Sequence, residues 1–276
     1  MSVSNLCIQN TLLDMGYEST SNKTSIIFSN VIDQVFFGFG STIQNGLITE
    51  AKKQMLPKNF KFPYYSLVEK SVLDFLGPKA GKKILDEINA ELSRHTKIEG
   101  STEDILNELS RKEILNKIRG ISGNEHIIYL WKDKNLRNNI LEEILENSKG
   151  SKTAFTSEDA IFSKVNQIPY SDLFLEKDKA VEKTFSSIIE THQKNNQEEP
   201  AVVIGFDGTK WLDAGLENEF LHLENKANKY LSENYVSGIC AYDLNKIPDE
   251  KTLKLFVKCH PTVLLDDPFV VYESGN

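Results

Sequence analysis

The sequence predicts an all-α N-terminal domain followed by an α/β domain with a doubly wound, mostly parallel sheet. The first hundred residues place apolar side chains at helical spacing, with Gly and Pro between the segments, whereas from His126 onward short apolar runs alternate with amphipathic segments. The run AVVIGF (Ala201–Phe206) is apolar throughout, which is typical of a strand buried on both faces of a parallel sheet. We therefore place the domains at residues 1–98 and 121–276, joined by a connector at 99–120.

Helical spacing predicts the elements of the first domain. Apolar residues recur every three or four positions over residues 36–55, 66–76 and 84–92. Gly77 and Pro78 are helix breakers, and they separate the last two helices.

The connector carries two helix-start signals. Ser101 with Asp104, and Ser110 with Glu113, both have the three-residue spacing of a capping box. We therefore expect two short helices in tandem between the domains.

The second domain is predicted as alternating strands and helices. Strands are expected at residues 126–131, 153–156, 201–206 and 235–242, and helices at 136–147, 179–193, 216–234 and 250–258. Such an alternation favours right-handed βαβ units.

Composition and charge exclude several classes of protein. The chain has 276 residues, 39% of them hydrophobic and 26% charged, which is an ordinary globular balance. No apolar run reaches the ~18 residues of a membrane helix, and no signal peptide is evident. Net charge is −8, and residues 101–276 hold 21 basic against 30 acidic residues, so we expect no nucleic-acid binding by the second domain.

The cysteines suggest a reducing compartment. Cys7, Cys240 and Cys259 have no CxxC spacing, which argues against a disulfide framework and a structural zinc site. We therefore expect a cytoplasmic protein with no metal ligands and no cofactor.

Candidate site residues gather near the predicted strand ends. Ligands of open α/β sheets bind outside the carboxyl ends of the strands. The candidates chosen on this ground are Trp131, Cys240, Tyr242, Asp243 and His260, and His126 is a further candidate at the start of the first predicted strand of this domain. Asp243 has an alternative role in stabilising the following turn, and Glu224 is expected to be a solvated helix charge.

The common catalytic and nucleotide-binding motifs are absent. The turn after the first predicted α/β strand reads KDKNLRNN (132–139) and lacks the glycines of a phosphate loop. The chain also has no GxSxG or HExxH motif, so no catalytic residue is assigned.

The second domain resembles the MEDS sensory domain of methanogens, methylotrophs and a dichloromethane-responsive regulator. The segments that carry the resemblance are GNEHIIYLW, VVIGFDGTKW, FLHLENKANKYL and above all ICAYDLNKI followed by KCHPTVLL. The resemblance implies a degenerate RecA- and KaiC-like fold without a phosphate loop and a sensor of small hydrocarbon derivatives. It also adds Asp207 to the candidates, one position after the place where the family carries an acidic residue.

The leading hypothesis is a non-catalytic cytoplasmic sensor that binds a small molecule and acts on a downstream signalling protein or regulator. We expect no association with a membrane. One alternative is an enzyme with Cys240 as nucleophile and His126 or His260 as base. Another is a protein-interaction adaptor with no small-molecule ligand.

Overall fold

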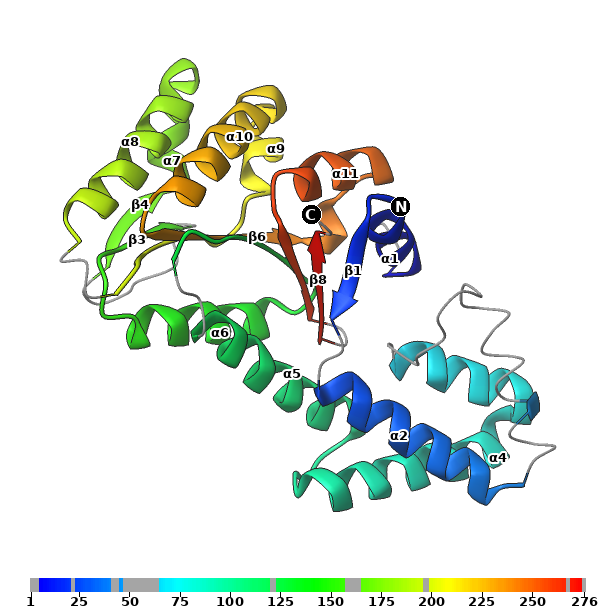
Figure 1. The fold of residues 1–276 in the computed structure, drawn as a ribbon. Coiled ribbons are helices and arrows are strands. Elements are labelled where there is room, and N and C mark those ends of the chain that lie inside the picture. The colour runs from blue at the N-terminus through cyan, green and yellow to red at the C-terminus, as the bar shows by residue number, and fades with distance from the viewer. Residues whose placement is uncertain are drawn as a thin grey trace. The chain divides into compact units, whose positions relative to one another are not determined.

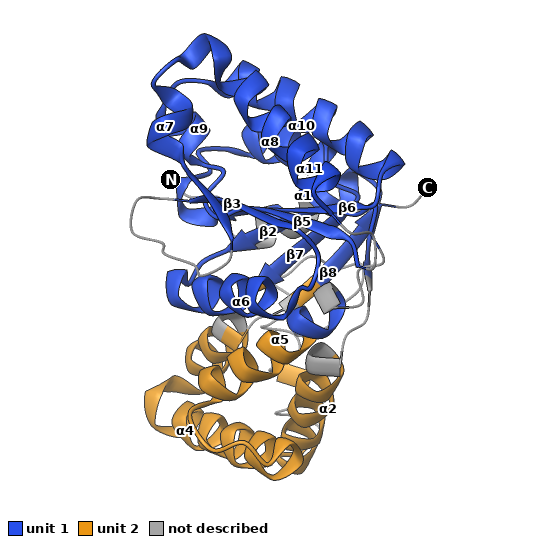
Figure 2. Ribbon diagram, turned by 90° about the vertical axis from the view of Figure 1, so that its left-hand side faces the viewer, with its two compact units in different colours: residues 1–19, 114–265, 271–276 blue, residues 20–113, 266–270 orange. Residues whose placement is uncertain are grey.

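The protein divides into two compact units (Figure 2). The computed structural model describes residues 5–20, 23–40, 45–46, 65–119, 123–156, 165–195, 199–266 and 269–274. Unit 1 comprises residues 1–19, 114–265 and 271–276, and unit 2 comprises residues 20–113 and 266–270.

An eight-stranded sheet forms the framework of the α/β unit, with the strand order β1-β8-β7-β2-β6-β5-β3-β4 (Figure 1). The strands are β1 (Tyr17–Thr20), β2 (His126–Trp131), β3 (Lys152–Thr156), β4 (Asn166–Pro169), β5 (Ala201–Gly205), β6 (Val236–Asp243), β7 (Thr262–Asp266) and β8 (Phe269–Ser274). All neighbours from β7 across to β4 pair in parallel, as the sequence predicted.

Helices cover both faces of this sheet (Figure 2). The main helices of unit 1 are α6 (Lys134–Asn147), α8 (Ala180–Gln193), α10 (Glu217–Glu233) and α11 (Glu250–Lys258), with short helices α7 (Tyr170–Phe174) and α9 (Lys210–Asp213). The crossover from β2 to β3 runs along the sheet in the opposite direction to those from β5 to β6 and from β6 to β7. Because parallel crossovers are right-handed, α6 lies on one face while α10 and α11 lie on the other.

The register of β2 and β6 sorts side chains between these two faces. Successive residues of a strand point to opposite faces. His126, Cys240 and Tyr242 fall on the face beneath α10, because β2 and β6 are paired in register. Trp131 pairs with Asp243, and both fall on the opposite face.

The central strands are the core of unit 1. Every residue of β2 and β7 is buried, as are Ala201–Ile204 of β5. The continuous apolar run predicted for a doubly covered parallel strand is therefore confirmed.

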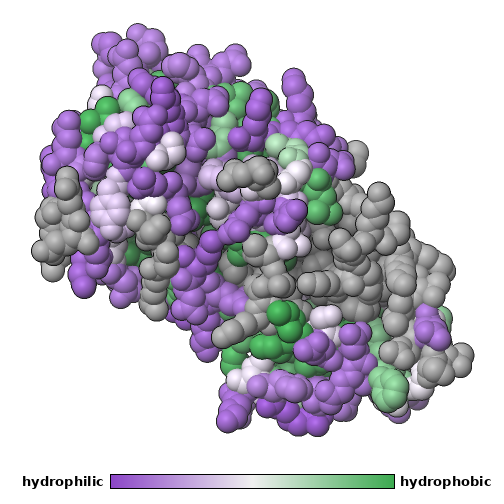
Figure 3. Space-filling model, in the orientation of Figure 1, coloured by the Kyte–Doolittle hydropathy of each residue, from purple (hydrophilic) through white to green (hydrophobic). Residues whose placement is uncertain are grey.

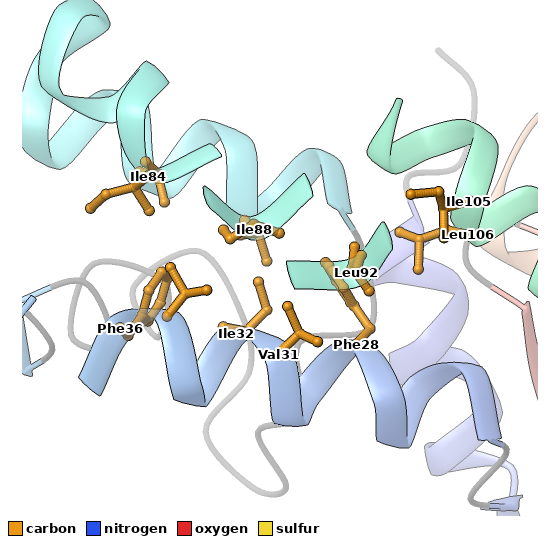
Figure 4. Close-up of a cluster of buried hydrophobic side chains, with 12 residues drawn as sticks. Phe28, Val31, Ile32, Phe36, Ile84, Ile88, Leu92, Ile105 and Leu106 are labelled. Carbon is orange, nitrogen blue, oxygen red and sulfur yellow. The ribbon is translucent and has the colours of Figure 1, made fainter. Parts of the chain in front are cut away.

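Unit 2 has a separate helical core. Helix α2 (Lys23–Gly38) packs on α4 (Tyr65–Thr96), and α5 (Thr102–Arg119) contributes Ile105 and Leu106. Figure 4 shows the buried side chains that meet there, among them Phe28, Ile32 and Ile88.

The predicted break within α4 is confirmed. Gly77 has φ 74° and ψ 169°, which are not helical values, and Pro78 follows it. A positive φ at this position favours glycine, since it has no Cβ.

The helix-start signals of the connector differ in outcome. Ser101 and Asp104 form the predicted capping box, with Asp104 N–H donating to Ser101 Oγ at 3.1 Å and Ser101 N–H donating to Asp104 Oδ2 at 2.9 Å. Ser110 lies fully buried inside α5, so the expectation of a second helix start was wrong. The interior of a helix accepts Ser when tertiary packing outweighs its capping preference.

The N-terminal boundary also differs from the prediction. Residues 17–20 form strand β1, and residues 1–19, which include helix α1 (Asn5–Asp14), belong to the α/β unit. Residues 1–98 are therefore not an all-helical domain. Helix α2 ends at Gly38, whereas the sequence predicted a helix over residues 36–55. Most of residues 41–64 lie outside the described residues.

The surface seen in Figure 3 is mostly hydrophilic where it belongs to unit 1. Among the described residues, no helix has the length and apolar character needed to cross a membrane.

Candidate functional site

Four polar side chains from separate elements of unit 1 meet between the sheet and the helices above it. His126 begins β2, Cys240 lies on β6, Glu224 projects from α10, and His260 stands between α11 and β7. His126, Glu224 and His260 are 2%, 4% and 0% exposed, and Cys240 is partly exposed. We call these residues the buried cluster.

The four groups are in direct contact. Glu224 Oε2 lies 3.2 Å from His126 Nε2 and 3.2 Å from His260 Nε2. Cys240 Sγ lies 3.5 Å from His126 Nε2 and 3.7 Å from Glu224 Oε1. The two imidazole rings have centroids 4.0 Å apart.

Neighbouring groups orient the buried cluster. His260 Nδ1 lies 2.7 Å from the Phe256 carbonyl oxygen, so this nitrogen carries the proton and donates it. Tyr242 donates its hydroxyl to Glu224 Oε1 at 3.3 Å. Gly238 allows a close approach of Leu231 and His126, because a Cβ there would lie 2.6 Å from Leu231 Cδ1 and 3.1 Å from His126 Cδ2.

The electrostatics of the buried cluster favour an ionised Glu224. Burial alone would raise the pKa of this carboxyl, but the two adjacent histidines, His260 foremost, lower it below its ordinary value. Burial and the neighbouring His260 lower the pKa of His126, against the opposing effect of Glu224.

The thiol and the phenol are held in their neutral forms. Burial, followed by the charge of Glu224, raises the pKa of Cys240 well above its ordinary value. The same two causes raise the pKa of Tyr242. In the absence of an additional cation, neither group is poised to ionise near neutral pH.

A small cavity opens beside the buried cluster, with a volume of about 50 Å³. His126, Glu224, Cys240 and Tyr242 line one corner of it, and the rest is mostly apolar. The apolar walls come chiefly from α8 and α10 and from strands of the sheet. They include Ile188, Val203, Phe220, Leu223, Ala227 and Leu231.

The remaining sequence candidates form a different group, at the carboxyl ends of the strands. Trp131 packs under the guanidinium of Arg137, whose carbon lies 4.5 Å from the ring centroid. Asp207 accepts from Thr209 and pairs with Lys246 at 3.4 Å. Asp243 accepts from the backbone N–H of Asn245 at 2.9 Å, the turn-stabilising role that the sequence analysis kept open.

The structure therefore changes the predicted location of the site. His126, Cys240, Tyr242 and His260 come together as candidates, but on the face of the sheet beneath α10. They extend along β6 instead of gathering at the strand ends, because His126 stands at the amino end of β2 and pairs with Gly238, whereas Tyr242 lies one residue before the carboxyl end of β6. Trp131, Asp207 and Asp243 do not join them.

Glu224 is the residue that sequence reasoning missed. It was expected to be a solvated charge, yet it is buried on the apolar face of α10 together with Phe220, Ala227 and Leu231. Those positions are separated by three or four residues and therefore lie on one face of the helix. A carboxylate within this apolar stripe was the sequence signal that Glu224 would be buried. Imidazole, thiolate and carboxylate are all ligands of transition metals. The prediction of no metal ligands rested on the absence of CxxC spacing, whereas these ligand atoms come from segments far apart in the sequence.

Cys259 does not belong to the buried cluster, although it is the neighbour of His260 in the sequence. Its Sγ lies 3.6 Å from Asn225 Oδ1 and 3.8 Å from the Leu255 carbonyl oxygen. Adjacent residues direct their side chains differently, so only His260 contacts Glu224.

No protein-family model matches this sequence, and a search of curated proteins found no similar chain.

Proposed function

We propose that this protein is a non-catalytic sensor that binds a small, mostly apolar molecule in the cavity beside the buried cluster. The observation that carries the proposal is the cavity itself, which combines mostly apolar walls with a few polar groups. Ligand pockets in proteins have this composition, because apolar surface supplies affinity and a few polar groups fix orientation.

The size of the cavity limits the ligand. One water needs about 10–15 Å³ of such volume, so a cavity of about 50 Å³ accepts a molecule of only a few non-hydrogen atoms. Simple hydrocarbon derivatives have this size. The resemblance of residues 126–272 to a sensory domain for such compounds supports the same ligand class.

Nucleotide binding is disfavoured at the place where a RecA-like domain would hold phosphate. The helix after β2 begins with Asp133 as its N-cap, and this carboxylate accepts from Asn135 N–H at 2.7 Å and Leu136 N–H at 3.0 Å. A negative charge already uses the amides that an anion would need. This supports a degenerate RecA-like fold without a phosphate loop.

A cysteine-dependent enzyme is the alternative that the Cys240–His126 contact of 3.5 Å favours. A nucleophilic cysteine must form a thiolate, and positive surroundings promote it. Here Glu224 places a negative charge beside the thiol and raises its pKa, so the geometry supports binding better than nucleophilic catalysis.

The sensor would act by changing the population of protein conformations. A ligand shifts such an equilibrium only by its differential affinity for the two states. Helix α10 supplies both Glu224 and the apolar wall residue Ala227, so it is the element that would respond to an occupied cavity. We propose a downstream signalling protein or regulator as the recipient.

The test is thermal unfolding of the full chain with dichloromethane, ethanol, acetaldehyde and ethanethiol. At about 100 times its dissociation constant a ligand adds about 2.7 kcal/mol of stability, which raises Tm by roughly 5–11 °C for a domain of this size. Ala227→Leu fills the cavity and is expected to abolish the shift.

Lys229→Leu is the matched control, because Lys229 is exposed on the same helix. It should keep the full response to the active compound. The proposal fails if no compound raises Tm, or if Ala227→Leu responds as strongly as the control.

A further inference from the structure

The buried cluster combines four ligand residues of three types, two imidazoles, a carboxylate and a thiol, from four segments of the chain. Each residue offers one ligand atom, and these atoms all lie within 4.8 Å of one another. Buried polar atoms normally satisfy one another through hydrogen bonds. The contacts within the buried cluster do not meet that expectation.

The Nε2 atom of His260 is a hydrogen-bond acceptor that receives no hydrogen bond. Its Nδ1 donates to the Phe256 carbonyl oxygen, so Nε2 of the neutral ring carries a lone pair. That Nε2 lies 3.2 Å from Glu224 Oε2 but makes no hydrogen bond, and it is fully buried. A lone pair facing a carboxylate oxygen at this distance is repulsive unless a proton or a metal cation lies between them, and the geometry at Nε2 forms no hydrogen bond.

The spacing of the four atoms matches a tetrahedral metal site. Zinc binds imidazole nitrogen and carboxylate oxygen at about 2.0–2.2 Å and thiolate sulfur at about 2.3 Å. Tetrahedral angles then place N and O about 3.3 Å apart, and S about 3.6 Å from both N and O. With Glu224 Oε2 as the ligand oxygen, the observed separations are 3.2 Å for both N–O pairs, 3.5 Å from Cys240 Sγ to His126 Nε2 and 3.9 Å from Cys240 Sγ to Oε2, and all four atoms lie within 4.8 Å of one another.

We propose that His126, Glu224, Cys240 and His260 bind one Zn²⁺ ion. Borderline-soft zinc accepts nitrogen, sulfur and oxygen ligands together, whereas Mg²⁺ and Ca²⁺ require oxygen. On binding, Cys240 coordinates as the thiolate and its proton passes to solvent. The ion supplies the positive charge that the ionised Glu224 and the thiolate both require in a buried setting.

Outer contacts already hold two of the ligands in place. The Phe256 carbonyl fixes the tautomer that presents His260 Nε2 inward, and the hydroxyl of Tyr242 donates to Glu224 Oε1. Metal-binding histidines ordinarily donate their second N–H to such a carbonyl or carboxylate. These contacts orient ligand atoms toward a common point.

The site would link β2, β6, α10 and the end of α11 through a single ion. Four protein ligands complete a tetrahedral zinc site, which is the arrangement of a structural metal. The inference does not depend on a sensor function. With ionised Glu224 and the Cys240 thiolate as ligands, the zinc site would carry no net charge, and three of its four ligands line the cavity.

The experiment is cobalt substitution of the full chain, stripped of metal and kept reduced. A thiolate-to-Co²⁺ charge-transfer band, with strong d–d bands of a tetrahedral centre, should appear and saturate at one ion per chain. Competing Zn²⁺ should remove both bands. Elemental analysis of protein purified without chelator should find about one zinc per chain.

Cys240→Ser should abolish the charge-transfer band, whereas Cys259→Ser should retain it. These two cysteines lie in the same part of the fold, but only Cys240 belongs to the buried cluster. Loss of outer contacts alone weakens metal sites by about 10–100-fold. We therefore expect at least about a tenfold loss of zinc affinity in Cys240→Ser and none in Cys259→Ser.

Two outcomes would exclude the zinc site. If Cys240→Ser fails to fold, the wild-type protein alone tests the site. The absence of both bound zinc and a thiolate–cobalt band in the wild-type protein would exclude it. Equal bands in both serine variants would exclude it as well. Ala227→Leu, which fills the cavity without changing a ligand, should retain zinc, so failure of ligand binding and failure of metal binding are distinguishable.

Discussion

At the scale of single residues, Arg137 explains how the carboxyl ends of the strands are stabilised. The guanidinium is buried, lies over Trp131 and donates to the Phe206 carbonyl oxygen. Burial lowers the pKa of Arg137, and the negative charges of Asp207 and Asp243 oppose that effect. Trp131, Asp207 and Asp243 therefore lie around the guanidinium of Arg137.

Arg137→Leu should destabilise the protein by about 2–3 kcal/mol, because it removes a cation–π contact and a charge-assisted hydrogen bond to the Phe206 carbonyl. Arg137→Lys keeps the charge but not the planar fork, so it should recover only part of the loss. Urea unfolding measures both. Lys134→Leu, an exposed change in the same helix, should alter stability by less than about 0.5 kcal/mol. Equal midpoints for Arg137→Leu and Lys134→Leu would contradict this role.

At the scale of elements, strand β1 is joined to the segment that carries His260. The Tyr17 hydroxyl lies 2.8 Å from the carbonyl oxygens of both Val257 and His260 and donates to them. Helix α1 also packs against α11. The N-terminal residues therefore help to position the end of α11, far away in the sequence.

Stability should fall at alkaline pH because of Tyr17. Burial, with a smaller effect of Cys259, raises its pKa from 10.0 to about 12. Since the folded-state pKa is the higher one, this contribution is complete below pH 10 and is lost as the pH rises from 10 toward about 12. Tyr17→Phe should lower stability by about 1 kcal/mol at neutral pH and lose this component of the alkaline decline. Urea midpoints between pH 8 and 12 test it, and identical pH profiles for both proteins would refute it.

At the scale of the whole molecule, each of the two units has its own buried apolar side chains among the described residues. The core of unit 2 is made by α2, α4 and α5 (Figure 4), whereas unit 1 is built on the central strands of the sheet. Regions with their own cores can open with different free energies.

Ile88→Ala should therefore destabilise one unit selectively. Ile88 is fully buried in unit 2, and truncating such a residue costs about 2–5 kcal/mol. Amide exchange followed by mass spectrometry should show faster exchange in α2 and α4, with β2, β5 and β6 unchanged. Ile204→Ala, at a fully buried position of β5, should give the opposite pattern. Uniformly faster exchange in either variant would mean that the protein unfolds as one unit.

Much of the fold could be predicted because its signals are local. The apolar run of β5, the break at Gly77 and the capping box at Ser101 each depend on a few neighbouring residues. Strand β1 and the membership of residues 1–19 could not be predicted in this way. The sequence YEST of β1 has little hydrophobic pattern, and its place at the sheet depends on partners far along the chain.

The sequence by itself determined the alternation of strands and helices and the identity of His126, Cys240, Tyr242 and His260 as candidates. Tertiary structure decided the register of β2 against β6, and with it the face on which these side chains meet. It also decided the burial of Glu224, which joins both histidines. Periodicity is a property of neighbouring residues, whereas a site of four segments depends on strand order and register, which long-range packing sets.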